Sequence, residues 1–451
     1  MDMSQEHINR RNFIKKTSTG LMTCSVLPGM WTVQNKTAEK KLNEKEITFR
    51  EYQKGQTLGK VLIVSGNDAP YMHTFFDVQP FSPSQRYIAL TRLPYQYKNP
   101  VYGDKADICI LDLESRMMRV IYSTKVWGHQ LGSNVQWGIN DQYVYANDWI
   151  GEVPVCVRID IHSGETLAYD GPLYHISPNA EFIAGFPPNL INYSQMGYGG
   201  PDNQSNKSKP YTGAPNNIGL IKTKLASNQK EMLFPLSAFQ KYYNDAKFKD
   251  GTFYLFHTKI NSSSDKIFQV VRCMVPNSNS WNPSLFTFDS NGSNLIQVIK
   301  PSQWAQGGNH PNWHPDGKRI IMNLRAKEEL NVDKISFVSF NSDGKEMKLL
   351  SKRSGSGHPS VTADDKYLVS DAYSKEKEFI NDLGEAKIRL IDLNKDDEEA
   401  ICHVYVPPVH VYGSLRIDPH PVWNRDFKKV LFCGAPEGKR EVFIADLSEV
   451  L

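Results

Sequence analysis

Three histidines, each followed by proline, stand at the same position in three consecutive stretches of the sequence: His310, His358 and His420. Neutral imidazoles bind zinc, manganese and other divalent metals, and they leave coordination positions open for water or substrate. A single histidine before a proline is more often a hydrogen-bond partner of the backbone. Three at one offset favour a shared site, so we expect these residues to hold a divalent metal (zinc, manganese or calcium).

Other polar residues stand near the corresponding position in earlier stretches. Asn134 occupies the offset that the histidines occupy later, and His129 lies five residues before it. His257 and Arg272 flank an expected hairpin, and Tyr198 lies in a glycine-rich loop. Taken alone, each is equally consistent with a loop anchor or a surface ion pair. The remaining histidines have no comparable position, and we interpret them as structural or surface residues: His7, His73, His162, His314 and His403.

These residues stand in or next to copies of a repeated sequence pattern, in which an apolar or aromatic residue precedes a polar turn and an apolar strand. Its seven copies begin near Pro80, Gln136, His175, Tyr254, Asn312, Ser360 and Val422. Alternating strands separate the copies, with almost no helical periodicity. Four short strands per unit are typical of a propeller blade, so we predict an all-β, seven-bladed β-propeller over residues 49–451. The last unit is short, and the strand that begins at Lys60 is expected to complete it.

Several strings resemble the propeller polysaccharide lyases, namely the oligogalacturonate lyases and the ulvan lyases. They include the segments 75–83, 132–137, 307–313, 357–360 and 416–423. In the oligogalacturonate lyases, histidines and a glutamine hold a divalent metal. The resemblance carries His310 and His420 over as ligands and makes His358 a third ligand, whereas Asp418 replaces a histidine of the family pattern.

The resemblance to ulvan lyases implies a base and an acid, for which His129 and Tyr198 are the best matches. His257 and Arg272 would lie near the uronate, and Asn134 and Arg416 would bind substrate. A second histidine that the pattern places soon after His129 is not found.

The implied reaction is β-elimination on a uronate-containing glycan. It requires neutralisation of the uronate carboxylate, a base for the C5 proton and an acid for the departing O4. The alternative is a non-catalytic binding propeller of the periplasmic TolB or WD40 type, in which the same turns are scaffold. A glycoside hydrolase would need a pair of facing carboxylates, and no pair occupies the channel offset.

The first residues of the chain resemble an export signal. Arg10 and Arg11 precede a mildly apolar stretch, which predicts a twin-arginine-type signal over 1–31, a linker over 32–48 and an exported protein. Cys24 has a poor lipidation context. The other five cysteines lack metal spacing, and we expect mostly buried free thiols.

The composition is that of a globular protein: 40% of the 451 residues are hydrophobic and 22% are charged. The net charge of +3 is small and the basic residues are scattered, which argues against nucleic-acid binding. No apolar run is long enough to span a membrane. We expect a monomer whose partner is an anionic polysaccharide or oligosaccharide.

Overall fold

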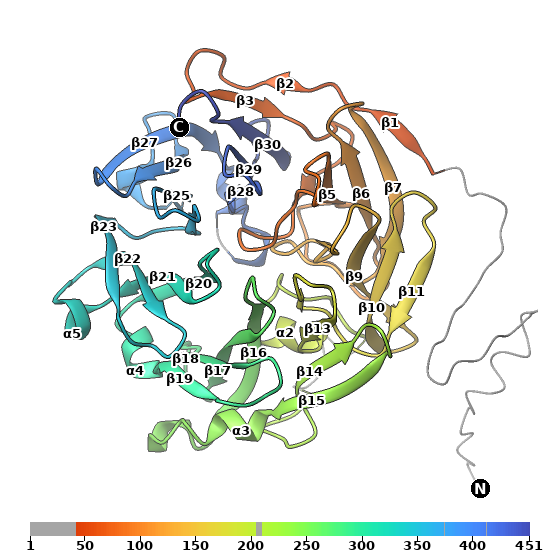
Figure 1. Cartoon of the computed structure of the whole chain (residues 1–451). Coiled ribbons are helices and arrows are strands. Elements are labelled where there is room, and N and C mark those ends of the chain that lie inside the picture. Colours follow the sequence, from red (N-terminus) through yellow and green to blue (C-terminus); the bar gives the residue numbers. More distant parts are fainter. Residues whose placement is uncertain (1–41, 204–209, 374, 412) are drawn as a thin grey trace, which may run out of the picture.

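The strands form a ring of seven antiparallel sheets around a central axis (Figure 1). This computed structural model describes residues 42–203, 210–373, 375–411 and 413–451. The ring of seven sheets confirms the predicted seven-bladed β-propeller. The expected export signal, 1–31, and most of the expected linker lie outside the described residues.

Each sheet is one blade, and its innermost strand faces the channel. The first blade contains β4 (Tyr71–Met72), β5 (Tyr87–Arg92), β6 (Ala106–Asp112) and β7 (Met117–Thr124), and the second contains β8 (Gln136–Trp137), β9 (Tyr143–Ile150), β10 (Val153–Asp160) and β11 (Thr166–Tyr169). The third blade contains β12 (His175–Ile176), β13 (Phe182–Gly185), β14 (Gly219–Lys224) and β15 (Gln229–Pro235). The fourth contains β16 (Thr252–Ile260), β17 (Lys266–Met274), β18 (Pro283–Asp289) and β19 (Ile296–Ile299). The fifth blade contains β20 (Gly308–Trp313), β21 (Arg319–Arg325), β22 (Ile335–Asn341) and β23 (Lys348–Ser354). The sixth contains β24 (Ser360–Val361), β25 (Tyr367–Ser370), β26 (Glu385–Asp392) and β27 (Asp397–Tyr405). The seventh contains β28 (Val422–Trp423), β29 (Lys429–Gly434) and β30 (Glu441–Asp446), joined by β3 (Lys60–Ile63) and β2 (Arg50–Glu51).

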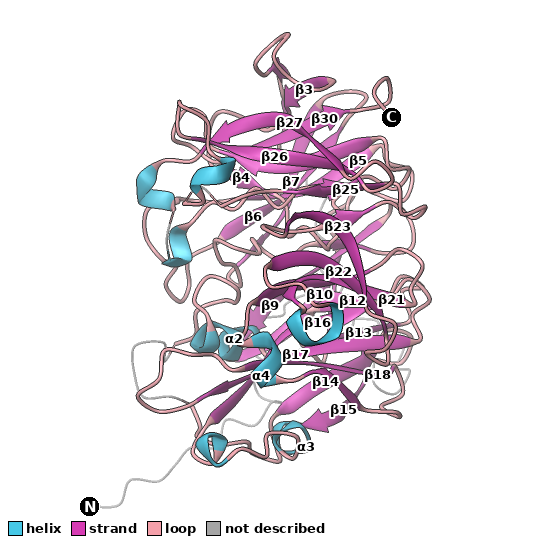
Figure 2. Ribbon diagram, turned by 90° about the vertical axis from the view of Figure 1, so that its left-hand side faces the viewer, coloured by secondary structure: helices cyan, strands magenta, loops and turns pink. Residues whose placement is uncertain are grey.

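Short helices connect some of these strands. They are α2 (Pro188–Ser194), α3 (Leu236–Gln240), α4 (Pro301–Trp304), α5 (Lys327–Leu330), and the 3₁₀ turns η2 (Ala246–Phe248), η3 (Lys377–Phe379), η4 (Pro408–His410) and η5 (Gly413–Leu415). In the side view α2 and α4 lie on the same side of the disc (Figure 2). No helix in the described part of the chain is long and apolar enough to cross a membrane.

The ring is closed by strands from both ends of the described chain. β3 pairs antiparallel with β30, with Lys60 opposite Asp446 and Ile63 opposite Phe443. The expectation that the early strand completes the last blade is thus confirmed. A further strand, β1 (Glu44–Glu46), pairs with β7 at the outer edge of the first blade, within the segment expected to be a linker.

The repeated turn has one physical basis in most blades. Its first residue accepts a backbone hydrogen bond from the fourth, and the fourth adopts a left-handed conformation with positive φ. The positive φ re-aims the chain into the next strand. The fourth residues are Gln85, Ala180, Ser264, Gly317, Asp365 and Phe427.

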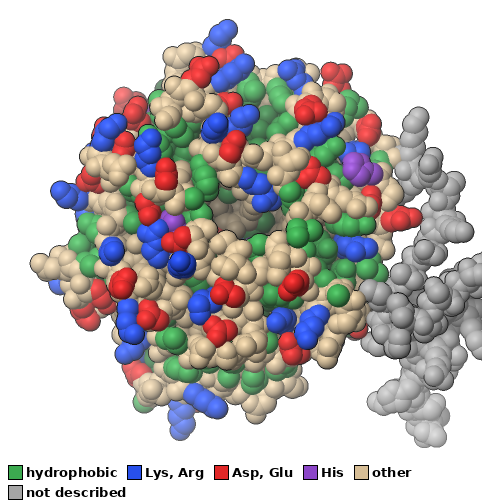
Figure 3. Space-filling view, viewed as in Figure 1, with side chains coloured by type: hydrophobic (Ala, Val, Ile, Leu, Met, Phe, Trp, Pro, Cys, Tyr) green, Lys and Arg blue, Asp and Glu red, His purple; other side chains and the backbone are tan. Residues whose placement is uncertain are grey.

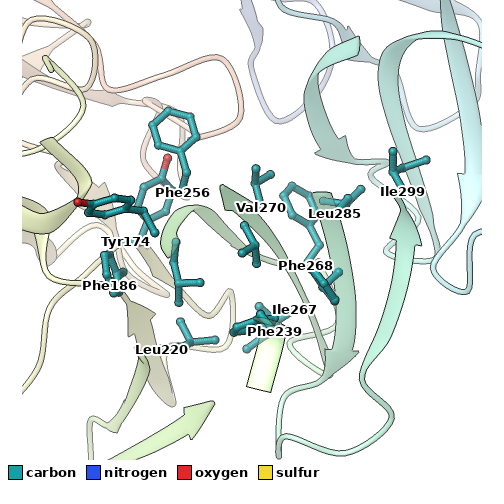
Figure 4. Packing of buried hydrophobic residues seen from close by; sticks show 14 of the residues in the cluster. Tyr174, Phe186, Leu220, Phe239, Phe256, Ile267, Phe268, Val270, Leu285 and Ile299 are labelled. Carbon is teal, nitrogen blue, oxygen red and sulfur yellow. The ribbon is translucent and has the colours of Figure 1, made fainter. Parts of the chain in front are cut away.

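Aromatic and aliphatic side chains fill the spaces between blades. Between the third and fourth blades, Phe186 and Leu220 pack with Phe239 and Ile267 (Figure 4). On the other face of the fourth blade, Phe268 lies 5.6 Å from Trp313 of the fifth blade between ring centroids. The five cysteines among the described residues are buried and unpaired, as expected.

The loop after β4 fills the channel axis. Phe75 packs 5.4 Å from His257 and 4.4 Å from His420 between ring centroids, and Phe76 lies 5.1 Å from His358. Asp77 of the same loop forms a buried ion pair with Lys259, Nζ to Oδ1 2.6 Å. These contacts give the inner histidines a fixed apolar floor.

Candidate active site

A cavity of about 630 Å³ lies above this floor. Its walls come from the loop after α2, from the inner parts of the fourth and fifth blades, from the loop after β25, and from the segment around η5. The cavity contains His257 and His310, and three cationic side chains: Arg272, Lys375 and Arg416. No aspartate or glutamate is found among the described residues that line it. The outer surface, in contrast, has basic and acidic side chains interspersed over the face shown in Figure 3.

His310 is fixed in one tautomer. Its Nδ1 lies 2.6 Å from the carbonyl oxygen of Gly357, and a carbonyl can only accept, so Nδ1 is the protonated nitrogen. Nε2 is then the acceptor, and the hydroxyl of Tyr373 donates to it over 3.3 Å at the cavity wall. Burial lowers the pKa of His310 well below its usual value, and the neighbouring His358 adds to this effect. A neutral imidazole whose unprotonated nitrogen lies at a cavity wall can act as a general base when a substrate C–H replaces the tyrosine hydroxyl beside it.

His358 and His420 lie beneath the cavity, where they meet Asp418. One ligand atom from each of the three residues lies within 4.8 Å of the others, and all three side chains are buried. The Nε2 atoms of His358 and His420 have no hydrogen-bond partner in the described part of the chain. Two unpartnered imidazole nitrogens and a carboxylate form a donor set that suits a divalent metal.

Asp371 holds His358 and His420 in place through hydrogen bonds. Its carboxylate lies 2.9 and 3.0 Å from Nδ1 of His358 and accepts the backbone N–H groups of His358 and His420. Electrostatic attraction to the His358 imidazole and these hydrogen bonds outweigh burial and lower the pKa of Asp371. A carboxylate on the far nitrogen of a histidine orients the ring and its lone pair toward a metal.

The structure brings the three predicted metal ligands together, but their ring nitrogens have different partners. The ring centroids of His310 and His358 are 3.8 Å apart, and those of His358 and His420 are 4.3 Å apart. The group with ligand atoms at metal-binding spacing contains Asp418 in place of His310. His310 instead uses Nδ1 on Gly357 and turns Nε2 to the cavity.

Strained backbone marks the same positions in several blades. Asn134, His257, His310 and His420 have φ between 50° and 54°. Non-glycine residues rarely adopt this conformation, although asparagine and histidine tolerate it better than most. Such strain recurs at functional sites, because the surrounding structure must hold it in place. Here it turns three histidines toward the channel.

Arg272 is a buried cation that lacks a carboxylate partner in the described part of the chain. Its guanidinium lies between the rings of Phe256, 3.4 Å away, and Trp281, 4.3 Å away. Nη2 donates to Oε1 of Gln195 over 2.7 Å, whereas Nε and Nη1 have no partner in that part. A buried guanidinium with unused donors is a site for an anion, and a carboxylate matches its geometry.

Tyr198 and Arg416 form the opposite part of the wall. Arg416 donates through Nη2 to the Tyr198 hydroxyl and through Nε to Oδ2 of Asp418, 2.6 Å away. Burial raises the pKa of Tyr198, although the charge of Arg416 opposes this. Because the hydroxyl oxygen accepts from Arg416, its own proton remains available to a ligand.

His257, predicted from the sequence, also lines the cavity. Its Nδ1 is hydrogen-bonded to the hydroxyl of Tyr174, and its ring stacks on Phe75. Burial lowers its pKa well below the usual value, so it is neutral.

Two predicted residues lie outside the cavity. His129 is fully buried, and its Nε2 is 2.8 Å from the carbonyl oxygen of Lys98. Its ring packs beside Trp127, 5.4 Å between ring centroids, within the closed turn between Gly128 and Gly132. Asn134 donates to the carbonyl oxygens of Leu173 and Tyr174. Both residues therefore serve to position the chain.

Three residues of the site had no signal in the repeats: Tyr373, Lys375 and Trp281. They lie in loops between the middle strands of the sixth and fourth blades, where repeat copies do not align. His73, interpreted as structural, is buried beside His420, 6.3 Å between ring centroids.

Comparison with known proteins shows the fold. No family model and no protein of curated function matches the sequence. The oligogalacturonate lyase of Vibrio parahaemolyticus aligns with a TM-score of 0.63 at 14% identity, over 90% of this chain and 98% of that one. An oligogalacturonate lyase in complex with manganese aligns with a TM-score of 0.62, at the same identity and coverage. The structure of a TolB protein from Agrobacterium tumefaciens aligns with a TM-score of only 0.38, at 12% identity, over 76% of this chain and 99% of that one.

Proposed function

We propose that this protein is a lyase that cleaves uronate-containing glycans by β-elimination. The observation that carries the proposal is the charge of the cavity wall: three cations and two neutral histidines, with no carboxylate among the described lining residues. Such a wall suits an anionic sugar, and it lacks the two acids that glycosidic hydrolysis requires. The similarity in fold to the oligogalacturonate lyases is consistent with this assignment.

The lining residues can be assigned to the parts of the reaction. Arg272, which lines the cavity, would bind the uronate carboxylate, which makes the C5 proton more acidic. His310 would remove that proton through Nε2, and the C4–O4 bond would break as the C4=C5 double bond forms. Tyr198 would donate its hydroxyl proton to the departing O4, while Arg416 stabilises the phenolate.

His358, His420 and Asp418 would hold a divalent metal. The unpartnered Nε2 atoms and the support of Asp371 fit such an ion. When bound, it would supply positive charge beneath the cavity and so stabilise charge that develops on the substrate carboxylate. The nearby Arg416 guanidinium, paired with Asp418, adds to the same field.

One assay tests this function. The protein is incubated with uronate polysaccharides and with their oligosaccharides, before and after removal of metal, and ultraviolet absorbance follows the unsaturated product. We expect product from at least one substrate. If no substrate gives product even with added manganese, zinc or calcium, while ligands still bind, the chain is a binding propeller.

A further inference from the structure

We infer that Tyr174 sets the tautomer of His257, so that His257 presents an N–H donor to the cavity while His310 presents a lone pair. The assignment of a task to His257 rests on the proposed function, but the tautomer itself does not. Tyr174 does not line the cavity, and it is thus a positioning residue of the site.

The geometry of the pair is simple. Tyr174 precedes β12 and is 2% exposed; its hydroxyl is hydrogen-bonded to Nδ1 of His257 at the bulge of β16. The hydroxyl makes no other hydrogen bond among the described residues. Lys259 lies 5.1 Å from the Tyr174 ring centroid and is paired with Asp77, and among the described residues the hydroxyl is hydrogen-bonded to His257 and to neither of these charged groups.

The direction of the hydrogen bond follows from the burial of the hydroxyl. If Nδ1 of His257 carried the proton, it would donate to the tyrosine oxygen, and the tyrosine hydrogen would be buried without an acceptor. If the tyrosine donates instead, the hydroxyl hydrogen and Nδ1 are both satisfied. Buried polar groups are rarely left unpaired. Nδ1 is therefore the acceptor, and the proton of the neutral ring lies on Nε2.

This leaves Nε2–H as the group that His257 offers to a ligand. His257 lines the cavity, and its other nitrogen is taken by Tyr174. His310 is the reverse case, because its Nδ1 donates to the Gly357 carbonyl and its Nε2 is an acceptor. Two histidines of neighbouring blades, each held with positive φ, thus present complementary groups to the same cavity.

For an elimination this arrangement has a clear use. As the C5 proton leaves, negative charge develops on the oxygens of the uronate carboxylate. A fixed N–H donor stabilises that charge without giving up its proton. His257 would thus act as a donor to the carboxylate beside Arg272, and His310 as the base. Their roles cannot be exchanged in this arrangement, because the Gly357 carbonyl can only accept a hydrogen bond from His310.

The tautomer can be measured in the full-length protein labelled with ¹⁵N-histidine. Two-bond ¹H–¹⁵N correlation distinguishes Nδ1–H from Nε2–H rings, and the His257→Asn variant identifies the signal. We expect His257 as the Nε2–H form and His310 as the Nδ1–H form. A wild-type His257 in the Nδ1–H form overturns the inference, whether or not the protein is a lyase.

Variants supply the second readout. In Tyr174→Phe the His257 signal should shift to a mixture of tautomers, whereas Tyr243→Phe, a buried tyrosine bonded to the Val271 carbonyl, should leave it unchanged. With an active substrate, Tyr174→Phe should lower kcat about 10- to 100-fold, more than it raises KM. An unchanged His257 signal in Tyr174→Phe also overturns the inference. Absence of activity in the wild type would count against the proposed function only. If Tyr174→Phe does not fold, the wild-type spectrum alone decides.

Discussion

The rings of His310 and His358 stack with centroids 3.8 Å apart, yet different partners hold them. His310 donates from Nδ1 to the Gly357 carbonyl, and Nδ1 of His358 lies against the carboxylate of Asp371. One lone pair therefore meets the cavity, and the other meets the group formed with His420 and Asp418. Two adjacent histidines of the same offset are thereby suited to two tasks.

Substitutions should separate these tasks. His310→Asn keeps a side chain that tolerates positive φ but removes the basic nitrogen, so turnover should fall by about a hundredfold or more while metal content is retained. His358→Gln should lower metal content, measured by elemental analysis after dialysis. If both variants lose metal equally, His310 is a ligand and the division of tasks is wrong.

Tyr198→Phe should lower turnover by about a hundredfold or more, because the ring and its packing remain and the proton donor is lost. The lost hydrogen bond to Arg416 should cost about 1 kcal/mol of unfolding free energy, measured in urea. The matched control is Tyr211→Phe, whose hydroxyl donates to the Phe253 carbonyl outside the cavity lining. Full activity of Tyr198→Phe would make Tyr198 a packing residue only.

The propeller could be predicted from the sequence because the same turn recurs at each inner hairpin. The turn needs a residue that tolerates positive φ and polar residues before it, and these leave a visible pattern at Ser82, Ser177 and His314. The histidines at the channel offset were found in the same way, because equal positions in successive blades converge on one axis.

The rest of the site could not be predicted in this way. Tyr373, Lys375 and Trp281 reach the cavity from loops that differ in every blade, so repeat alignment gives them no position. His129 lies close to the offset, but a local closed turn directs it to the Lys98 carbonyl. The hydrogen-bond partners that fix tautomers, such as Gly357, come from a neighbouring blade and are visible only once the ring is built.

Trp281 should contribute to sugar binding. It is 42% exposed, lines the cavity and packs one face against Arg272, so Trp281→Ala removes an aromatic surface and one side of the Arg272 sandwich. We expect a KM about tenfold higher, as the loss of about 1.4 kcal/mol of binding would give, with a smaller change in kcat. Trp281→Phe should restore most of the affinity. Equal KM values for all three proteins would place the substrate elsewhere in the cavity.

Stability should depend on pH through buried neutral histidines. Burial, assisted by the charge of Arg440, lowers the pKa of His129 to about 4, and burial lowers those of His175 and His257 well below the usual value. The unfolded chain protonates these residues near pH 6.5, while the folded chain does not. As the pH falls below about 6.5, the unfolded state therefore binds more protons and the free energy of unfolding declines. Each histidine contributes up to about 1.4 kcal/mol per pH unit, and for His129 this continues to about pH 4.

Urea unfolding at pH 7 and at pH 5 measures this decline. His129→Gln retains a donor for the Lys98 carbonyl but cannot be protonated. Between pH 7 and pH 5 its free energy of unfolding should therefore fall by less than that of the wild type, and the difference is the contribution of one histidine. His162→Gln, at an exposed turn, serves as the control and should behave as the wild type. A wild-type unfolding free energy that is equal at pH 7 and pH 5 would show that these histidines protonate without cost in the folded state.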